Sequence, residues 1–362
     1  MRDLSRMYLD YYGLRERPFS LLPDPEFLFW ARPHSKAYTM LEYGIASHAP
    51  ITVITGEIGC GKTMLVRKLL SEIPMEFSVG LISNATGGRG ELLHWVMMSL
   101  GQEVAAGATY VQIFRSFQEF LIEEYAQGRR TALIFDEAQN LTAETLEELR
   151  MFSNINADKD ELLQLILVGQ PELREMVRQP QMQQFAQRIA SEFHLRALSE
   201  PEVAGYIAHR MAIGGAEREV FDADAALLIH AACRGVPRLV NQLCDYALVY
   251  GFAAEEPIID VRIVREVLED RRDYGVFSDP DVVLGAAAPQ APPRSQAPEV
   301  LEAPDEMTAA DVAGEAEASR PEIPPDGPAA ATPATAPRGA EKKSGEKLGE
   351  NVFYGVWGER KV

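Results

Sequence analysis

The sequence of 362 residues has few cysteines and no long apolar segment. Its three cysteines, Cys60, Cys233 and Cys244, are too few for a disulfide framework and are typical of a reducing compartment. No apolar run approaches the roughly 18 residues that cross a bilayer. Residues 1–12 lack the apolar core of a signal peptide. These absences predict a cytoplasmic protein that would reach the inner membrane only through a partner.

Basic residues are also scarce, because 35 Lys and Arg stand against 54 Asp and Glu, giving a formal net charge of −19. Broad nonspecific binding to nucleic acid needs a basic footprint, so this balance argues against it, although a local basic patch remains compatible. None of the six histidines is spaced from a cysteine or another histidine as metal ligands are. A hydrophobic fraction of 46% is sufficient for a folded core.

Composition predicts four regions along the chain. They are an aromatic segment and helix over residues 1–50, an α/β domain over 51–198, a helical subdomain over 199–275 and a tail over 276–362. The tail is rich in Ala, Pro, Glu and Gly, which cannot bury enough apolar surface to offset chain entropy, so residues 279–349 are predicted to be disordered. Residues 351–362 again contain aromatic side chains. They are either a short peptide that docks to a partner on a flexible tether or an apolar terminal segment without a specific partner.

Strand-like and helix-like segments alternate before residue 199, the pattern of an α/β fold with a parallel sheet. Five short buried strands are predicted over residues 51–55, 77–83, 131–135, 163–168 and 192–195. Helices are predicted over residues 91–100, 110–125 and 142–154. Beyond this point the strand signals stop, and four helices are predicted to begin near Ser199, Asp222, Pro237 and Asp260.

The segment Gly56-Glu-Ile-Gly-Cys-Gly-Lys62-Thr63 matches the phosphate-binding P-loop in full. Glycines let successive backbone N–H groups turn onto phosphates, and the helix that starts near Lys62 adds the positive end of its dipole. Lys62 is expected to reach the β- and γ-phosphates, and the Thr63 hydroxyl to bind Mg²⁺. Cys60 is interpreted as a small loop residue rather than a redox switch. The predicted nucleotide-binding residues are Gly56, Glu57, Ile58, Gly59, Cys60, Gly61, Lys62, Thr63 and Met64.

Two carboxylates end the apolar strand Thr131-Ala-Leu-Ile-Phe-Asp136-Glu137. In phosphoryl transfer one acid supports the metal and another group orients or deprotonates the attacking water. Asp136 is therefore predicted to be the metal-associated acid and Glu137 the base. Gln170 comes just past the next buried strand. It either sits between the water and the γ-phosphate or caps the helix that Pro171 begins.

Two arginines complete the candidate site. Arg238 stands in the first turn of a predicted helix, where a cation opposes the helix dipole, so an anion such as the γ-phosphate is expected nearby. Arg188 ends a helix just before the fifth strand. It acts either as an arginine finger on the phosphate of a neighbouring subunit or as a cation that solvates the carbonyls of its own helix.

Together these motifs resemble those of AAA+ ATPases. More narrowly, the chain is similar to the ExeA type, whose members are general-secretion-pathway A proteins and ATPases of exosortase and exopolysaccharide systems. The segments that carry this likeness are Tyr12-Gly-Leu-Arg-Glu-Arg-Pro-Phe19, Pro23-Asp-Pro-Glu-Phe27, Asp136-Glu-Ala-Gln-Asn-Leu141, Gly169-Gln-Pro-Glu-Leu173 and Arg234-Gly-Val-Pro-Arg-Leu-Val-Asn241. Secretion members typically add a membrane span and a peptidoglycan-binding part, which this sequence does not show. Membrane tethering and cell-wall remodelling are therefore not carried over.

The resemblance implies an α/β P-loop NTPase fold of the AAA+ kind. Its five-stranded parallel sheet is sandwiched by helices and followed by a helical lid and the disordered tail. It also implies ATP and Mg²⁺ as ligands, a homo-oligomer in the form of a dimer or ring, and envelope or secretion-system partners, docked through the tail or elsewhere. In the family the N-terminal aromatic segment packs beside the nucleotide, so the resemblance implies that Tyr11, Phe19 or Phe29 shapes the adenine site. The alternative for each of these residues is ordinary packing in the hydrophobic core.

The predicted function is an ATPase that energises or regulates assembly of a bacterial envelope secretion or polysaccharide-export system. Two alternatives remain at this stage. One is a DNA-associated regulatory ATPase of the transposition type, whose activity DNA would stimulate in a salt-dependent way. The other is a slow, nucleotide-gated scaffold that works mainly by binding partners.

Overall fold

The computed structural model describes residues 4–83, 91–157 and 160–271 of the 362-residue chain. These residues all fall in one of the two compact units into which the chain divides. The segments expected to be disordered (279–349) and to dock a partner (351–362) lie outside the described residues.

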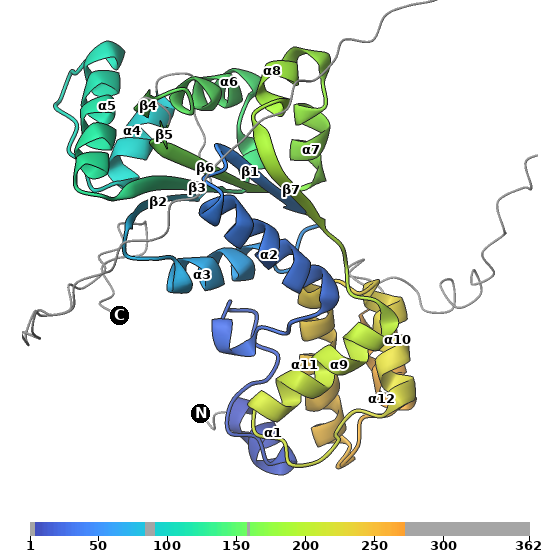
Figure 1. The fold of residues 1–362 in the computed structure, drawn as a ribbon. Coiled ribbons are helices and arrows are strands. Elements are labelled where there is room, and N and C mark those ends of the chain that lie inside the picture. The colour runs from blue at the N-terminus through green and yellow to red at the C-terminus, as the bar shows by residue number, and fades with distance from the viewer. Residues whose placement is uncertain (1–3, 84–90, 158–159, 272–362) are drawn as a thin grey trace, which may run out of the picture. The chain divides into compact units, whose positions relative to one another are not determined.

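A five-stranded parallel sheet in the order β2-β3-β6-β1-β7 organises the α/β part (Figure 1). Its strands are β1 (Ile51–Gly56), β2 (Phe77–Ser83), β3 (Arg130–Asp136), β6 (Leu163–Gly169) and β7 (Ile189–Leu195). The predicted α/β class and the five strands are confirmed. Strand β7 begins at Ile189 rather than at residue 192, because Ile189 and Ser191 pair with Ile51 and Thr52 of β1, which no local pattern in the sequence indicates. A short ladder of β4 (Asn156–Ala157) and β5 (Asp160–Glu161) was not predicted.

Helices cover both faces of the sheet, because alternate side chains of each strand point to opposite sides. Ile54, Ile134 and Ile166 face one core, which α2 and α3 close. Val53 and Leu133 face the other core, which α4, α5, α6 and α7 close (Figure 1). The helices of this part are α2 (Arg32–Ala46), α3 (Lys62–Glu72), α4 (Glu91–Ser99), α5 (Tyr110–Ala126), α6 (Ala143–Phe152), α7 (Pro171–Val177) and α8 (Gln183–Ala186).

Side-chain caps fix several of the helix ends. Thr142 Oγ1 accepts a hydrogen bond from the Thr145 backbone N–H over 3.2 Å, which starts α6 where the sequence predicted it. Leu141 and Leu146, in the positions of a hydrophobic staple, are both buried beside this cap. The backbone N–H of Ser199 donates to Glu202 Oε2 over 2.9 Å at the start of α9.

A helical subdomain follows the sheet, as expected. It consists of α9 (Glu200–Ile213), α10 (Ala223–Cys233), α11 (Pro237–Ala253) and α12 (Val261–Asp270). The N-terminal helix α1 (Leu4–Tyr12) packs against this subdomain rather than against the sheet (Figure 1). Tyr8 Oη donates to Asp245 Oδ1 over 3.0 Å, and Tyr12 Oη donates to the Glu256 carbonyl over 3.1 Å. Tyr8 and Tyr12 of α1 thus belong to the core of the lid.

Gly235 joins the lid to the segment that leaves the sheet. Its carbonyl accepts a hydrogen bond from the Leu198 N–H over 2.9 Å, and its φ is +72°. A Cβ at this position would lie 1.9 Å from the Leu198 carbonyl oxygen. Only glycine accommodates both the left-handed backbone and this approach. The start of α11, which carries Arg238, is therefore held against the exit of β7.

Candidate nucleotide-binding site

The P-loop lies between the carboxyl end of β1 and the amino end of α3. Lys62 is buried, and its Nζ donates to the Gly56 and Glu57 carbonyls over 2.7 and 3.0 Å. Burial lowers the pKa of Lys62, although the neighbouring carboxylates of Glu137 and Asp136 oppose that shift. The ammonium group is thus held at the edge of the loop, where an anionic ligand would stabilise its charge.

The lid touches the P-loop at Gly59. The Arg238 backbone N–H donates to the Gly59 carbonyl over 3.2 Å. A Cβ on Gly59 would lie 2.7 Å from the Arg238 Cβ, and the φ of Gly59 is +80°, so this position also requires glycine. Helix α11 is in this way fixed beside the loop that would hold the phosphates.

Thr63 and Asp136 meet across the site. Thr63 Oγ1 donates to Asp136 Oδ2 over 2.9 Å, and the Glu137 N–H donates to Asp136 Oδ1 over 3.0 Å. Burial raises the pKa of Asp136, and these two hydrogen bonds oppose the rise. A hydroxyl and a carboxylate are hard oxygen ligands, which suit Mg²⁺ because that ion takes few protein groups and completes its shell with water and phosphate. No cluster of three or more His, Cys, Asp or Glu residues able to hold a metal occurs in the described part of the chain.

Glu137 is held by two side-chain amides. Gln139 Nε2 donates to Glu137 Oε2 over 2.6 Å, and Gln170 Nε2 donates to the same oxygen over 3.1 Å. Gln139 Oε1 in turn accepts the Gln170 backbone N–H over 2.9 Å. Burial would raise the pKa of Glu137, but the two amides and the Lys62 charge outweigh it, so the pKa is lowered and the carboxylate is ionised.

The backbone of Glu137 is in the left-handed region, with φ +56°, which is uncommon for a residue with a side chain. This conformation turns the chain sharply after β3, into the short 3₁₀ turn Ala138–Asn140. The turn brings Gln139 back toward the Glu137 carboxylate. The carboxylate orientation is thus fixed by both the backbone and the amide pair.

A cavity of about 230 Å³ lies between the P-loop, the end of β3 and the start of α11. It is lined by Lys62, Thr63, Glu137, Gln170 and Arg238, with Asn241 of α11. The predicted loop residues Ile58, Gly59, Gly61 and Met64 also border it. Most candidate residues from the P-loop, from the ends of β3 and β6 and from the lid therefore lie around one space, and their individual roles remain predictions. Gly56, Glu57, Cys60 and Asp136 are not among its lining residues.

A smaller cavity of about 50 Å³ adjoins the first one through Gly61, Met64 and Arg210, which line both. Phe29 and His34 form part of its wall. Of the aromatic residues considered for the adenine site, only Phe29 is placed here. Phe19 is buried against Phe221, and Tyr11 contacts Phe252, so both belong to the lid core. Their positions favour the ordinary-core interpretation.

Cys60 is fully buried within the loop, and burial raises the pKa of its thiol. A protonated, inaccessible thiol is a poor redox centre. The position therefore favours the small-residue interpretation over the redox switch.

Arg188 lies away from this site. It precedes β7, at the amino end of a strand whose carboxyl end points to the P-loop edge of the parallel sheet. A strand of this length spans roughly 20 Å. Its guanidinium donates to the Ser153 carbonyl over 3.1 Å and to Asn154 Oδ1. Arg188 does not reach the cavity of its own chain, so a role in hydrolysis requires a second copy.

Three residues at the site were missed in the sequence. Gln139 belongs to a segment quoted only for its likeness to the family. His34 Nε2 donates a hydrogen bond to the Cys60 carbonyl over 2.9 Å, and its buried Nδ1 has no partner among the residues that the structure describes. Arg210 is buried, lies 4.8 Å from the Phe27 ring centroid and donates to Tyr206 Oη over 2.9 Å. Of the three, only Gln139 could have been recognised from the sequence, because it lies two residues after Glu137. His34 and Arg210 reach the site from segments that are distant in the sequence.

Replacing Gln139 with leucine is expected to lower the kcat of hydrolysis by at least about tenfold, since a hydrogen bond to a charged group contributes about 1.5–3 kcal/mol. The KM for ATP should stay unchanged, because Gln139 touches Glu137 and Gln170 but does not line the phosphate cavity. Steady-state kinetics of the variant measure both constants. Gln181→Leu, at an exposed position remote from the cavity, is the matched control. A rise in KM with an unchanged kcat would contradict the positioning role.

Comparison with known proteins identifies the class of protein to which this chain belongs. Residues 45–177 match the family model described as AAA domain. The described fold is also similar to two solved structures. Cdc6p from Pyrobaculum aerophilum has a TM-score of 0.57 and 17% identity, with 70% of each chain covered. The ORC2 protein of Aeropyrum pernix, in its ADPNP-ADP complexes, has a TM-score of 0.54 and 17% identity, covering 70% of this chain and 71% of that one. The chain therefore is an AAA-domain protein with the P-loop fold.

The resemblance to the ExeA type is also confirmed. The chain is 34% identical over 285 residues to General secretion pathway protein A of Aeromonas hydrophila, covering 78% of this chain and 52% of that protein. It thus spans about half the length of the curated relative that it matches. Among the helices that the structure describes, none is long and apolar enough to cross a bilayer.

Proposed function

We propose that this protein binds ATP with Mg²⁺ and hydrolyses the bond between its β- and γ-phosphates. The observation that supports the proposal most strongly is the cavity in which the P-loop, Glu137 and Arg238 converge. The purine would lie toward the adjoining smaller cavity, on the side of Phe29 and His34. The N–H groups of the loop and the dipole of α3 would bind the phosphates.

Each residue has a separate task in this proposal. Lys62 binds the β- and γ-phosphates, and Thr63 and Asp136 hold Mg²⁺, which offsets the charge of the phosphates when bound. Glu137, ionised and oriented by two amides, accepts a proton from the attacking water. Gln170 and Arg238 contact the γ-phosphate. Because Arg238 lies in the first turn of α11, which contacts Gly59, loss of that phosphate would change the position of the lid.

Arg188 is proposed to act on the nucleotide of a neighbouring copy in a dimer or ring. Its distance from the cavity of its own chain supports an action in trans, as described above. An arginine finger is worth about 10³–10⁵ in kcat where it has been measured. A heterologous interface, in which one face of a copy meets a different face of the next, would place it there.

We propose further that the ATPase cycle serves assembly of a bacterial envelope system. The support is the 34% identity to General secretion pathway protein A, which covers only 52% of that protein.

Affinity capture with a hydrolysis-dead variant tests this role. A Glu137→Gln protein loaded with ATP should retain envelope secretion or polysaccharide-export proteins, and the same protein without nucleotide should retain fewer. The bound proteins are identified by mass spectrometry. Enrichment of transposition proteins, together with ATPase activity that DNA stimulates and salt abolishes, would instead support the DNA-associated alternative.

A further inference from the structure

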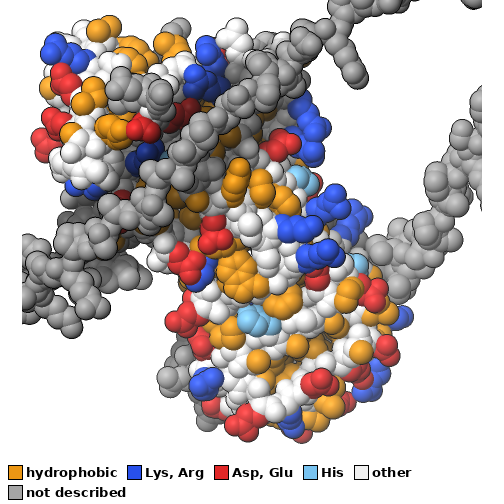
Figure 2. Space-filling view, viewed as in Figure 1, with side chains coloured by type: hydrophobic (Ala, Val, Ile, Leu, Met, Phe, Trp, Pro, Cys, Tyr) orange, Lys and Arg blue, Asp and Glu red, His pale blue; other side chains and the backbone are white. Residues whose placement is uncertain are grey.

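A basic groove of about 750 Å³ lies outside the nucleotide site, along strand β7. Five cations line it: Arg32, Lys36, Arg174, Arg178 and Arg196. Within the part of the chain that the structure describes, none of them forms an ion pair with a carboxylate. Figure 2 shows Lys and Arg side chains gathered on this side of the molecule, beside β7 and the start of α2.

The acidic residues of the groove do not cancel this charge. Glu202 is engaged with Ser199, whose N–H and Oγ both donate to Oε2, over 2.9 and 2.8 Å. Glu192 is exposed and is the other carboxylate in the lining. Burial lowers the pKa of His194, and the charges of Arg174 and Arg196 lower it further. The groove is therefore a positive region on a chain whose formal net charge is −19.

Strand β7 is the last strand of the sheet, and in the described ranges no strand pairs with its outer side. An edge strand presents N–H and C=O groups that another extended chain can pair with. Apolar side chains, among them Val177, Ile189 and Phe193, form part of the lining. This arrangement suits a peptide backbone better than the phosphates of a rigid duplex.

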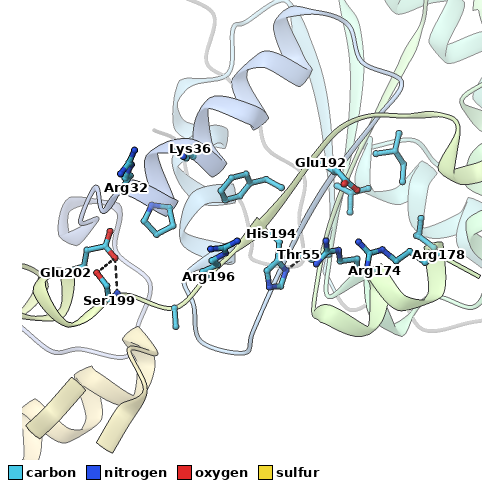
Figure 3. A pocket seen from close by; sticks show the side chains of 16 residues that line it. Arg32, Lys36, Thr55, Arg174, Arg178, Glu192, His194, Arg196, Ser199 and Glu202 are labelled. Carbon is cyan, nitrogen blue, oxygen red and sulfur yellow. Dashed lines mark hydrogen bonds between the residues drawn. The ribbon is translucent and has the colours of Figure 1, made fainter. Parts of the chain in front are cut away.

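The cations stand on both sides of this edge. Arg32 and Lys36 belong to α2, which covers one face of the sheet. Arg174 belongs to α7, which covers the other face, and Arg178 directly follows that helix (Figure 3). Successive side chains of an added strand point alternately to the two faces. Acidic side chains on both faces of such a strand would meet a pair of cations on each side.

We propose that the basic groove binds an extended acidic segment of a partner protein, which adds a strand to the free edge of β7. The bound segment would lie beside Arg196, where the chain runs from the sheet to the Leu198–Gly235 junction with the lid. A partner could thus act on the lid without entering the nucleotide site. This inference goes beyond the proposed ATPase function and does not depend on it.

Fluorescence anisotropy with a labelled acidic peptide tests the proposal. The probe is a peptide of about ten residues built from Glu and Val, at the upper end of usual strand lengths. The full chain should bind it, and the double variant Arg174→Glu/Arg178→Glu should bind at least about tenfold more weakly. Arg32→Glu/Lys36→Glu, on the opposite wall, should have a similar effect. Circular dichroism checks that each variant is folded.

Two controls separate strand addition from general attraction. An analogue that is N-methylated at every residue keeps its charge but loses the N–H donors of both strand edges, so its binding should weaken. Arg115→Glu, on the exposed face of α5, should leave the affinity unchanged. Equal binding of the methylated analogue, equal loss in Arg115→Glu, or tighter binding of duplex DNA than of the peptide would overturn the proposal. Binding is measured without nucleotide and in the Lys62→Ala variant, so that a failed ATPase hypothesis does not affect the result.

Discussion

Replacing Glu137 with glutamine is expected to abolish ATP hydrolysis while ATP binding stays close to that of the wild type. The substitution keeps the size of the side chain and removes the group proposed to accept a proton from water. General base catalysis contributes about 10²–10⁴ to the rate, so turnover should fall by at least that range. Lys62, Thr63 and Arg238, which would grip the phosphates, are unchanged.

Phosphate release and equilibrium ATP binding, measured on the same preparation, check this expectation. Glu123→Gln removes a carboxylate from the exposed surface of α5 and is the matched control. Normal turnover in Glu137→Gln would place the base elsewhere. Loss of ATP binding in that variant would mean that Glu137 supports the site rather than the chemistry.

Mixing two inactive variants is expected to restore hydrolysis. Lys62→Ala should not bind ATP, because the cation of the P-loop is gone. Arg188→Ala should bind ATP but hydrolyse it about 10³-fold or more slowly, since a missing arginine finger costs at least that much. In a mixed assembly, an intact P-loop of one copy can meet the intact Arg188 of the next.

With equal amounts and random assembly, about a quarter of the sites would combine both intact residues in a heterologous interface. Phosphate release from the mixture, compared with each variant alone, measures this recovery. Asn154→Ala removes the side-chain acceptor of Arg188 but keeps the cation, so it controls for local structure. A mixture as inactive as its parents, or a fully active Arg188→Ala, would contradict action in trans.

Much of the fold could be predicted because its signals are local. Apolar strands such as the one ending at Asp136, caps such as Thr142, and the glycines of the P-loop each act through neighbouring residues in the sequence. These local signals were sufficient to predict the sheet, the helical lid and the edge of the sheet where the carboxylates lie near the P-loop. The predicted start of β7 was wrong by three residues, because residues 189–191 join the strand through pairing with β1 rather than through a local pattern of apolar residues.

The remaining features depend on contacts between distant segments. Tyr8 and Tyr12 join the lid core through partners beyond residue 240, which no local pattern indicates. His34 reaches the P-loop from another helix. The cations of the basic groove come from separate parts of the chain, so the negative net charge of the whole sequence gave no indication of it. Gln139 could be seen in the sequence, but its contact with Glu137 depends on the left-handed turn after β3.

The central claim is that the cavity beside Lys62 holds ATP with Mg²⁺ and supports its hydrolysis. The most direct measurement incubates the purified full chain with ATP labelled on the γ-phosphate, at millimolar Mg²⁺ and in parallel with a chelator. The account predicts that the chain retains ATP and releases labelled phosphate, and that the chelator stops the release. A chain that neither retains ATP nor releases phosphate at millimolar Mg²⁺ would contradict it.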